Sequence, residues 1–373
     1  MSPRSIRVLV VDDSAVIREI ISDIVSEAPD MQVAGTANDG EHALSMLDRV
    51  NPDVITLDVQ MPRMDGLAAL DAILARRAIP VIMVSSLTKL GATITLDALD
   101  RGAIDYVPKP DYGKDARAGL RDDLLRKIRT AAGIDVRRIL TIREERKRKL
   151  ASRTRSAPPP KPTPETPTAQ ATALADKCIA LGISTGGPPA LSLLFESLRP
   201  PMPPIVVVQH MPPHFTRPLA WRLDSLSQLS IKEAETGDQL QPNHVFIAPG
   251  GRHLQLRPAG RSAKIWLDDG PPVSGHKPSV DVMMTSAARI FGRRCLGIIM
   301  TGMGRDGSDG CRAIRSAGGL VLGQDEASSD VYGMNKVAFV EGNVDRQFSL
   351  SGAAQLIAEC IRRQWQPLPV GSA

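Results

Sequence analysis

Three polar residues in the second half of the chain have the types and the spacing needed for nucleophilic catalysis. Ser184 stands in the glycine-rich stretch Gly182–Pro188, directly after a short apolar run. His210 follows the next apolar run, and Asp306 lies in a second glycine-rich stretch after a later one. A serine nucleophile, a histidine base and a carboxylate that orients the histidine form the triad of many hydrolases. The pattern therefore predicts acyl transfer to water, with backbone N–H groups of the serine turn stabilising an oxyanion.

Each member of this triad also has an alternative interpretation. The G-x-S-x-G pattern around Ser184 fits a turn that only packs or one that binds phosphate, although no lysine follows the glycines as in a nucleotide-binding loop. His214 is a second candidate base, and His210 is favoured because it directly follows the apolar run. Asp306 could cap a helix. The chain order Ser, His, Asp differs from that of α/β hydrolases and disfavours that fold.

A second set of polar residues, in the first half, could accept a phosphoryl group. Each follows one of the short apolar runs: Asp12, Asp13, Asp58, Ser85 and Lys109. The carboxyl ends of parallel strands meet at one edge, so these residues should converge there. Three carboxylates together need a cation, and oxygen ligands with room for water suit Mg²⁺. We expect Asp58 to attack the phosphoryl group while Lys109 and Ser85 bind its oxygens, with Ser86 as the alternative hydroxyl.

These residues can meet only if the apolar runs are strands of parallel sheets. Residues 1–130 alternate five such runs with segments of helical spacing, which predicts a flavodoxin-like (βα)5 domain. Residues 176–370 repeat the alternation and predict a second, doubly wound, mainly parallel α/β domain, with a hairpin over Gln255–Leu267. Residues 131–175 are first charged and then rich in Pro, Thr and Ala, which predicts a linker. Its charged part, Arg137–Lys149, could extend the last helix of the first domain.

The individual runs give the expected elements of the second domain. Strands are predicted at Cys178–Ile183, Ile205–Gln209, Val245–Ala248, Cys295–Met300 and Leu320–Gly323. Helices are predicted at Leu191–Leu198, Pro218–Leu226, Ser279–Phe291, Gly310–Ala317 and Ser351–Arg363. Ser184, His210 and Asp306 would then all follow strands at the same edge of one sheet.

Composition limits the compartment and the partners. Because only 3% of the residues are aromatic, both cores must be built from aliphatic residues and methionine. The four cysteines, Cys178, Cys295, Cys311 and Cys360, lack CxxC spacing and are expected to be buried and reduced. The chain shows no signal peptide and no apolar run of about 18 residues, which predicts a cytoplasmic protein without membrane insertion. The basic run Arg143–Arg155 is interpreted as a solvated helix end, or alternatively as a contact with an acidic partner or nucleic acid.

Four short motifs in the first half resemble the signatures of response-regulator receiver domains: VLVVDDS, LDVQMPRMDG, MVSS and YVPKP. The resemblance covers residues 6 to about 130. It implies Asp58 as the phosphoacceptor and Asp12 and Asp13 as further Mg²⁺ ligands. It also implies Ser85 and Tyr106 as the switch pair, and a histidine kinase as the phosphodonor, CheA in chemotaxis.

Six motifs in the second half resemble the catalytic domain of the chemotaxis protein-glutamate methylesterase (CheB) family: GISTGGP, VVQHMPPHFT, HVFIAPG, DDGPPVSGHKPSVDVMM, IIMTGMGRDG and VYGMNK. The resemblance covers residues 177 to about 365. It implies Ser184 as nucleophile, His210 as general base and Asp306 as its orienting carboxylate. Thr185 and Met303 would flank the site, with the Met303 N–H as a candidate oxyanion donor.

The two resemblances together imply a phosphorylation-activated hydrolase. Its substrates would be the glutamate γ-methyl esters of chemoreceptors, with methanol as product, and particular receptor glutamines would be deamidated. The unphosphorylated receiver would cover the catalytic residues, and only the receiver would use Mg²⁺. Ile183 departs from the alanine usual in the family and would change local packing without removing a catalytic group.

Two other classes of output domain are alternatives for the second half. A DNA-binding response regulator would use the basic run, but the second half has no evident helix-turn-helix reader. A nucleotide-binding module would use GISTGGP and TGMGRDG as phosphate loops. The predicted partners are therefore chemoreceptors and a CheA-type kinase, with no nucleic acid.

Overall fold

A computed structural model describes residues 5–86, 88–109, 114–153 and 169–365 of the chain. The chain forms two compact units, Met1–Arg148 and Lys149–Ala373. The exact limits of the predicted domains and linker stay predictions, and residues 154–168 lie outside the described residues. Among the described helices, none has both the length and the apolar composition that a membrane span requires.

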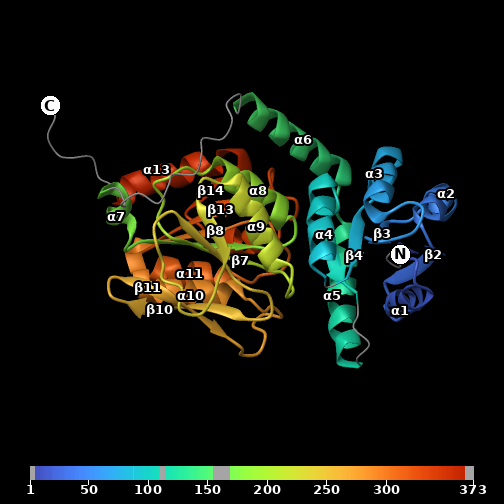
Figure 1. The fold of residues 1–373 in the computed structure, drawn as a ribbon, viewed down its shortest axis with the longest axis horizontal. Coiled ribbons are helices and arrows are strands. Elements are labelled where there is room, and N and C mark those ends of the chain that lie inside the picture. The colour runs from blue at the N-terminus through green and yellow to red at the C-terminus, as the bar shows by residue number, and fades with distance from the viewer. Residues whose placement is uncertain (1–4, 87, 110–113, 154–168, 366–373) are drawn as a thin grey trace. The chain divides into compact units, whose positions relative to one another are not determined.

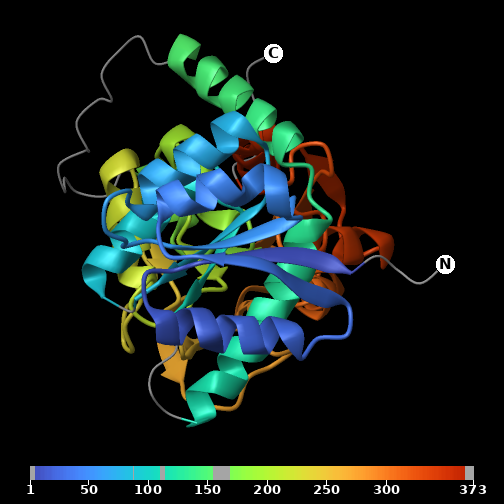
Figure 2. The same ribbon diagram turned by 90° about the vertical axis from the view of Figure 1, so that its right-hand side faces the viewer.

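The first unit is a five-stranded parallel sheet in the order β2-β1-β3-β4-β5. Its strands are β1 Ile6–Val11, β2 Met31–Ala37, β3 Val54–Asp58, β4 Val81–Ser85 and β5 Asp105–Pro108. Its helices are α1 Ala15–Ser26, α2 Gly40–Val50, α3 Gly66–Arg76, α4 Lys89–Arg101 and α5 Lys114–Ala132. Helices α1 and α5 cover one face of the sheet and α2, α3 and α4 the other (Figure 2). The predicted (βα)5 fold is confirmed.

The charged segment after α5 forms a separate helix, α6 Val136–Arg153. The prediction that it extends the last helix of the first domain is wrong, because α5 ends at Ala132 and the chain turns before α6. The first residue of the basic run, Arg143, is buried, and its Nη1 donates to the Leu99 carbonyl oxygen at 2.6 Å. This arginine therefore satisfies the end of α4, so it is not part of a solvated basic face.

The second unit is built on a seven-stranded sheet in the order β14-β13-β12-β6-β7-β9-β8, with every neighbouring pair parallel. Its strands are β6 Cys178–Ile183, β7 Ile205–Gln209, β8 Ser230–Glu233, β9 His244–Ile247, β12 Cys295–Ile299, β13 Leu320–Gln324 and β14 Arg346–Phe348. The chain runs outward from β6 in one direction to β9 and β8, and later in the other to β12, β13 and β14. The point where the direction changes lies between β6 and β12, which is where open α/β sheets bind ligands.

Helices cover both faces of this sheet, which confirms the doubly wound prediction. They are α8 Gly187–Ser197, α9 Thr216–Leu226, α10 Val280–Phe291, α11 Ser308–Ser316, α12 Met334–Val340 and α13 Ala353–Trp365, with a short α7 at Ala169–Leu174. Helices α8, α9 and α13 pack together, and α10 packs with α11, as Figure 1 shows. The predicted hairpin is present as β10 His253–Ala259 and β11 Ser262–Asp268, an antiparallel pair against α10.

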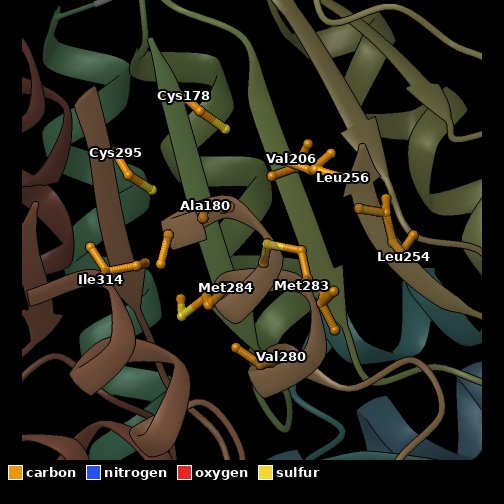
Figure 3. Packing of buried hydrophobic residues seen from close by; sticks show 14 of the residues in the cluster. Cys178, Ala180, Val206, Leu254, Leu256, Val280, Met283, Met284, Cys295 and Ile314 are labelled. Carbon is orange, nitrogen blue, oxygen red and sulfur yellow. The ribbon is translucent and has the colours of Figure 1, made fainter. Parts of the chain in front are cut away.

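Helix α10 is fixed by an apolar face that is fully enclosed. Val280, Met283 and Met284 lie between strands β6 and β12 and the hairpin strand β10 (Figure 3). Cys178 and Cys295, on adjacent strands, belong to the same cluster, and all four cysteines are free and buried as predicted. Burial of this kind contributes about 25 cal/mol per Å² of apolar surface. The start of α10 is therefore held rigidly beneath the edge of the sheet.

Four elements of the second unit were not predicted. Strand β8 (SIKE) and strand β14 (RQF) are short, polar edge strands without an apolar run. Helix α12 (MNKVAFV) follows a glycine and is too short to show helical periodicity. The residues of α7 were placed in the linker, yet Ala171 and Leu174 are buried. None of these differences alters the three strands that carry the predicted triad.

Candidate active site and phosphoacceptor site

The turn that carries Ser184 is tied to the strands on both sides of β6. The Ser184 N–H donates to the Thr301 carbonyl oxygen at 2.9 Å, which links the end of β6 to the end of β12. The Ser184 carbonyl oxygen accepts from the Gly187 N–H at 2.8 Å and from Gln209 Nε2 at 3.0 Å. Gln209 ends β7, so the serine turn is fixed from three adjacent strand ends.

Space for the Ser184 side chain is provided by Gly302. A Cβ atom at Gly302 would lie 2.7 Å from Ser184 Cβ and 2.5 Å from Met334 Sδ, distances that packed carbon atoms do not adopt. Residue 302 must therefore be glycine for the serine to keep its position. Met303 follows on the same turn, and Thr185 is buried beside Ser184. Both predicted flanking residues lie at this edge of the sheet.

His210 is joined to Asp306 by a direct hydrogen bond. His210 Nε2 lies 2.7 Å from Asp306 Oδ2, and both side chains are almost fully buried. The His210 ring also stacks on the His276 ring, with centroids 3.7 Å apart and planes 6° from parallel. The other ring nitrogen, Nδ1, has no hydrogen-bond partner among the described residues. It is thus the nitrogen that can take a proton. The rejected alternative, His214, is exposed in the loop before α9.

Asp306 is held by the first turn of α10 and does not cap its own helix. Its Oδ1 accepts from the Ser279 hydroxyl at 2.8 Å and from the Asp281 N–H at 3.1 Å, and its Oδ2 accepts from the Val280 N–H at 2.7 Å. Burial alone would raise the pKa of Asp306. The hydrogen bond with His210 and the backbone N–H donors outweigh burial and hold that pKa well below its usual range. Asp306 is therefore an anion at neutral pH.

The structure thus brings the three residues to neighbouring strand ends: Asp306 follows β12, Ser184 follows β6 and His210 follows β7. Ser184 Oγ makes no hydrogen bond to His210 or to another described residue. Catalytic hydrogen bonds are often unformed before substrate binds, so this does not argue against the pair. The arrangement provides a hydroxyl, a histidine with one free nitrogen, and a buried anion behind it.

Three residues that build this site were not predicted from the sequence. Gln209 ends an apolar run, and its Nε2 binds the backbone of the serine turn. Ser279 and Asp281 sit at the start of α10 and contact Asp306. The available signal was a serine before a helix, which predicts a cap. That signal does not reveal that the capped helix start binds a carboxylate from a distant turn.

The carboxylates of the first unit also meet at a strand edge. Oxygen atoms of Asp12, Asp13 and Asp58 all lie within 4.8 Å of one another. Lys109 Nζ lies 2.8 Å from Asp58 Oδ2 and 2.9 Å from Asp12 Oδ2. Asp12 and Asp58 are buried and Asp13 is exposed, so a cation bound here could keep water ligands on one side. The donor set of close carboxylate oxygens fits Mg²⁺.

Burial and mutual repulsion control the charges of this cluster. Burial, followed by repulsion from Asp12, raises the pKa of Asp58 to about 6. Burial also raises the pKa of Asp12. Burial would lower the pKa of Lys109, but its contacts with Asp58 and Asp12 outweigh that effect and raise it. Asp12 and Asp58 therefore repel each other and share the single positive charge of Lys109, and a bound cation would reduce this repulsion.

The predicted switch residues flank this cluster. Ser85 is fully buried at the end of β4, directly beside β3, which ends in Asp58. Ser86 Oγ, the alternative hydroxyl, lies 3.2 Å from Thr88 Oγ1 and is only partly buried, so Ser85 has the more enclosed position. The Tyr106 ring is buried, and Lys127 Nζ lies 5.1 Å from its centroid while donating to the Tyr106 carbonyl oxygen at 2.6 Å.

Comparison with known proteins assigns a family to each unit. Residues 8–117 match the response regulator receiver domain, and residues 179–357 match the CheB methylesterase family. The class of protein is therefore a response regulator whose output domain has a methylesterase fold. The methylesterase match occupies residues 179–357, the part of the chain in which a DNA-binding or nucleotide-binding output domain was the alternative. The comparison therefore favours the methylesterase over both alternatives.

Relatives match over almost the whole chain. The protein-glutamate methylesterase/protein-glutamine glutaminase of Pectobacterium atrosepticum is 43% identical and covers 94% of this chain and 95% of its own length. The corresponding protein 1 of Geobacter metallireducens is 44% identical over 92% of this chain and 93% of its own. The crystal structure of the Thermotoga maritima CheB methylesterase catalytic domain is 38% identical, covers 49% of this chain and 97% of its own, and has a TM-score of 0.48. The chain belongs to the protein-glutamate methylesterase/protein-glutamine glutaminase family.

Proposed function

We propose that this protein hydrolyses the γ-methyl esters of glutamate side chains on chemoreceptors, releases methanol, and deamidates particular receptor glutamines. The single observation that carries the proposal is the 2.7 Å contact between His210 Nε2 and Asp306 Oδ2 at the strand end next to Ser184. The names of the relatives support the substrate class. Activity would rise when the receiver is phosphorylated.

The first half-reaction is acylation of Ser184. Its Oγ attacks the ester carbonyl carbon while its proton moves to the free Nδ1 of His210. The buried Asp306 stabilises the imidazolium that forms, because its negative charge is held in place by α10 and cannot move away. His210 then gives the proton to the departing methoxide, and methanol leaves. The N–H of Met303 is the proposed oxyanion donor.

The second half-reaction releases the product. Water attacks the acyl carbon, His210 takes one of its protons, and the proton passes to Ser184 Oγ as the acyl bond breaks. The receptor side chain leaves as a glutamate carboxylate. With a glutamine substrate the same steps release ammonia in place of methanol, so one site serves both reactions. The esterase step uses no metal in this proposal.

Control is proposed to start at Asp58, whose carboxylate attacks a phosphoryl group supplied by a CheA-type histidine kinase. Asp12, Asp13 and Asp58 would hold Mg²⁺, which offsets charge on the phosphoryl oxygens when bound. Lys109, now shared between two carboxylates, would bind a phosphoryl oxygen, and Ser85 would donate to another. Phosphorylation of Asp58, together with rearrangement of the switch residues Ser85 and Tyr106, shifts the population toward a state in which the active site is uncovered. We place the protein in the cytoplasm, without nucleic-acid partners.

The proposal is tested by mass spectrometry of receptor peptides. Methylated receptor in membranes is incubated with the full chain or with Ser184→Ala, and the methylation-region peptides are compared. We expect conversion of methyl glutamate to glutamate, and of some glutamine to glutamate, only with the unaltered chain. Unchanged peptides after incubation with phosphorylated enzyme would refute the proposed substrate class.

A further inference from the structure

One buried carboxyl group next to the active site takes no part in the steps above. Asp281 lies in the first turn of α10 and is 9% exposed. Its Oδ1 accepts from the Gly307 N–H at 2.9 Å and from the Gly310 N–H at 2.7 Å. Gly307 directly follows Asp306, and Gly310 lies in the first turn of α11. Asp281 therefore connects the start of α10 to the turn that carries Asp306.

The same residue contacts Asp306 itself. The Asp281 N–H donates to Asp306 Oδ1 at 3.1 Å, and Asp281 Oδ1 accepts from the N–H of Gly307, the residue next to Asp306, so the two carboxyl groups lie close together. Two ionised carboxylates in such contact repel strongly when buried, and the usual solution is a shared proton. His210 and three backbone or hydroxyl donors already favour the charged form of Asp306. Asp281 accepts from two backbone N–H groups, fewer donors than Asp306 has, so a proton held by the pair is favoured on Asp281.

The other charged groups around Asp281 do not remove this conflict. Asp309 on α11 adds negative charge, and the buried Cys311 thiol is neutral. Arg305, a cation that interacts with Asp281, is more than half exposed and is paired with Glu341 and Asp309. Burial, followed by repulsion from Asp306, raises the pKa of Asp281 to about 7, although the Gly310 N–H opposes the shift.

We propose that Asp281 is a positioning residue for the hydrolysis: its protonated carboxyl group holds the Asp306 turn through Gly307 and Gly310 and keeps the pair at a single charge, located beside His210. This inference rests on the proposed function. Loss of the proton above neutral pH would place a second anion against Asp306 and loosen the turn. The enzyme would then lose activity as the pH rises through the range in which Asp281 ionises.

Two variants separate the hydrogen bonds that Asp281 accepts from the effect of its proton. Asp281→Asn keeps an oxygen acceptor for Gly307 and Gly310 and an N–H donor toward Asp306, and it cannot ionise. Asp281→Ala leaves two buried N–H groups without a partner. The matched control is Asp309→Asn, which removes a neighbouring charge from an exposed carboxylate that does not contact Asp306.

The kinetic test is methanol release by the full chain from methylated receptor membranes, measured from about pH 6 to about pH 9. We expect Asp281→Ala to lower kcat about tenfold with little change in KM. Asp281→Asn should restore kcat at neutral pH to within about threefold of the unaltered chain and should lose the alkaline decline. Asp309→Asn should keep the kcat at neutral pH and should still show an alkaline decline, because Asp281 can still ionise. A pH profile of Asp281→Asn that matches the unaltered chain would overturn the inference.

A second readout needs no substrate. Because the folded pKa of Asp281 is raised above the ordinary 3.8, the folded state binds this proton more tightly than the unfolded state. Stability from this group therefore falls as pH rises from about 4 to about 7. The Tm of Asp281→Asn minus that of the unaltered chain should grow over this range by about 5 °C. A constant difference would overturn the inference. Absence of methanol release by the unaltered chain would instead refute the proposed function and leave this readout intact.

Discussion

The two sites of this protein use buried aspartates at the edges of parallel sheets in opposite ways. In the first unit, Asp58 faces Asp12 and shares one lysine with it, and its pKa is raised to about 6. In the second unit, Asp306 faces backbone N–H donors and His210, and its pKa is lowered. The first aspartate is therefore poised to change its charge, and the second is held permanently ionised.

The difference follows from which partners can move. The ammonium group of Lys109 is carried by a long, flexible side chain and can leave Asp12 to bind an incoming phosphoryl oxygen. Two of the donors to Asp306, the N–H groups of Val280 and Asp281, belong to the backbone of α10, whose apolar face is packed in the core (Figure 3). A switch needs a site whose charge balance can be rearranged, whereas catalysis needs a charge that is fixed before the substrate arrives.

The largest expected effect is the loss of methanol release in Ser184→Ala, which should leave the phosphoacceptor site unaffected. Ser184→Ala should lower methanol release by about 10⁴-fold, because the nucleophile is lost, without changing phosphorylation of Asp58. The measurement pairs methanol release with phosphoprotein formation from acetyl phosphate. The matched control is Ser192→Ala on α8, which removes a hydroxyl that donates to the Pro188 carbonyl oxygen and should leave methanol release unchanged. Residual activity above about one tenth would show that Ser184 is not the nucleophile.

The next effect tests the fixed charge. Asp306→Asn should lower kcat about 10³-fold, because a neutral amide cannot stabilise the His210 imidazolium. It should also lower Tm at neutral pH: a carboxyl whose folded pKa is depressed contributes stability above its unfolded pKa, and the variant lacks that contribution. Activity assays and thermal melts at neutral pH check both. An unchanged kcat would mean that His210 is oriented by other groups.

The smallest effect tests the movable charge and has the opposite sign. Asp58→Asn should raise Tm by about 5 °C at about pH 8 and by less at about pH 5. Its folded pKa of about 6 lies above the ordinary 3.8, so ionisation costs stability as pH rises through that range. Thermal melts of the full chain at both pH values check this prediction. A lower Tm for Asp58→Asn at the higher pH would contradict the contrast with Asp306.

How far the sequence predicts this molecule depends on the range of the interactions. Ser184, His210 and Asp306 were predictable because each follows an apolar run, and parallel strands align such ends. The edge strands β8 and β14 were not predictable from the sequence, because they are short and polar. They form only because a neighbouring strand offers unpaired backbone groups.

The supporting residues of the active site show the same limit. Asp281 contacts Gly307 and Gly310, which lie 26 and 29 residues away along the chain. No local periodicity encodes such contacts, because they depend on how α10 and α11 pack together. Arg143 was assigned to a solvated run for the same reason, since its partner, the Leu99 carbonyl, lies 44 residues away.

The most direct test of the account is methanol release from methylated receptor membranes by the full chain, with and without acetyl phosphate and Mg²⁺, alongside Asp58→Ala and Ser184→Ala. We predict release that depends on Ser184, rises with acetyl phosphate, and does not rise in Asp58→Ala. Release that is indifferent to Ser184, or stimulation that persists in Asp58→Ala, would contradict the link between a movable charge at one sheet edge and a fixed charge at the other.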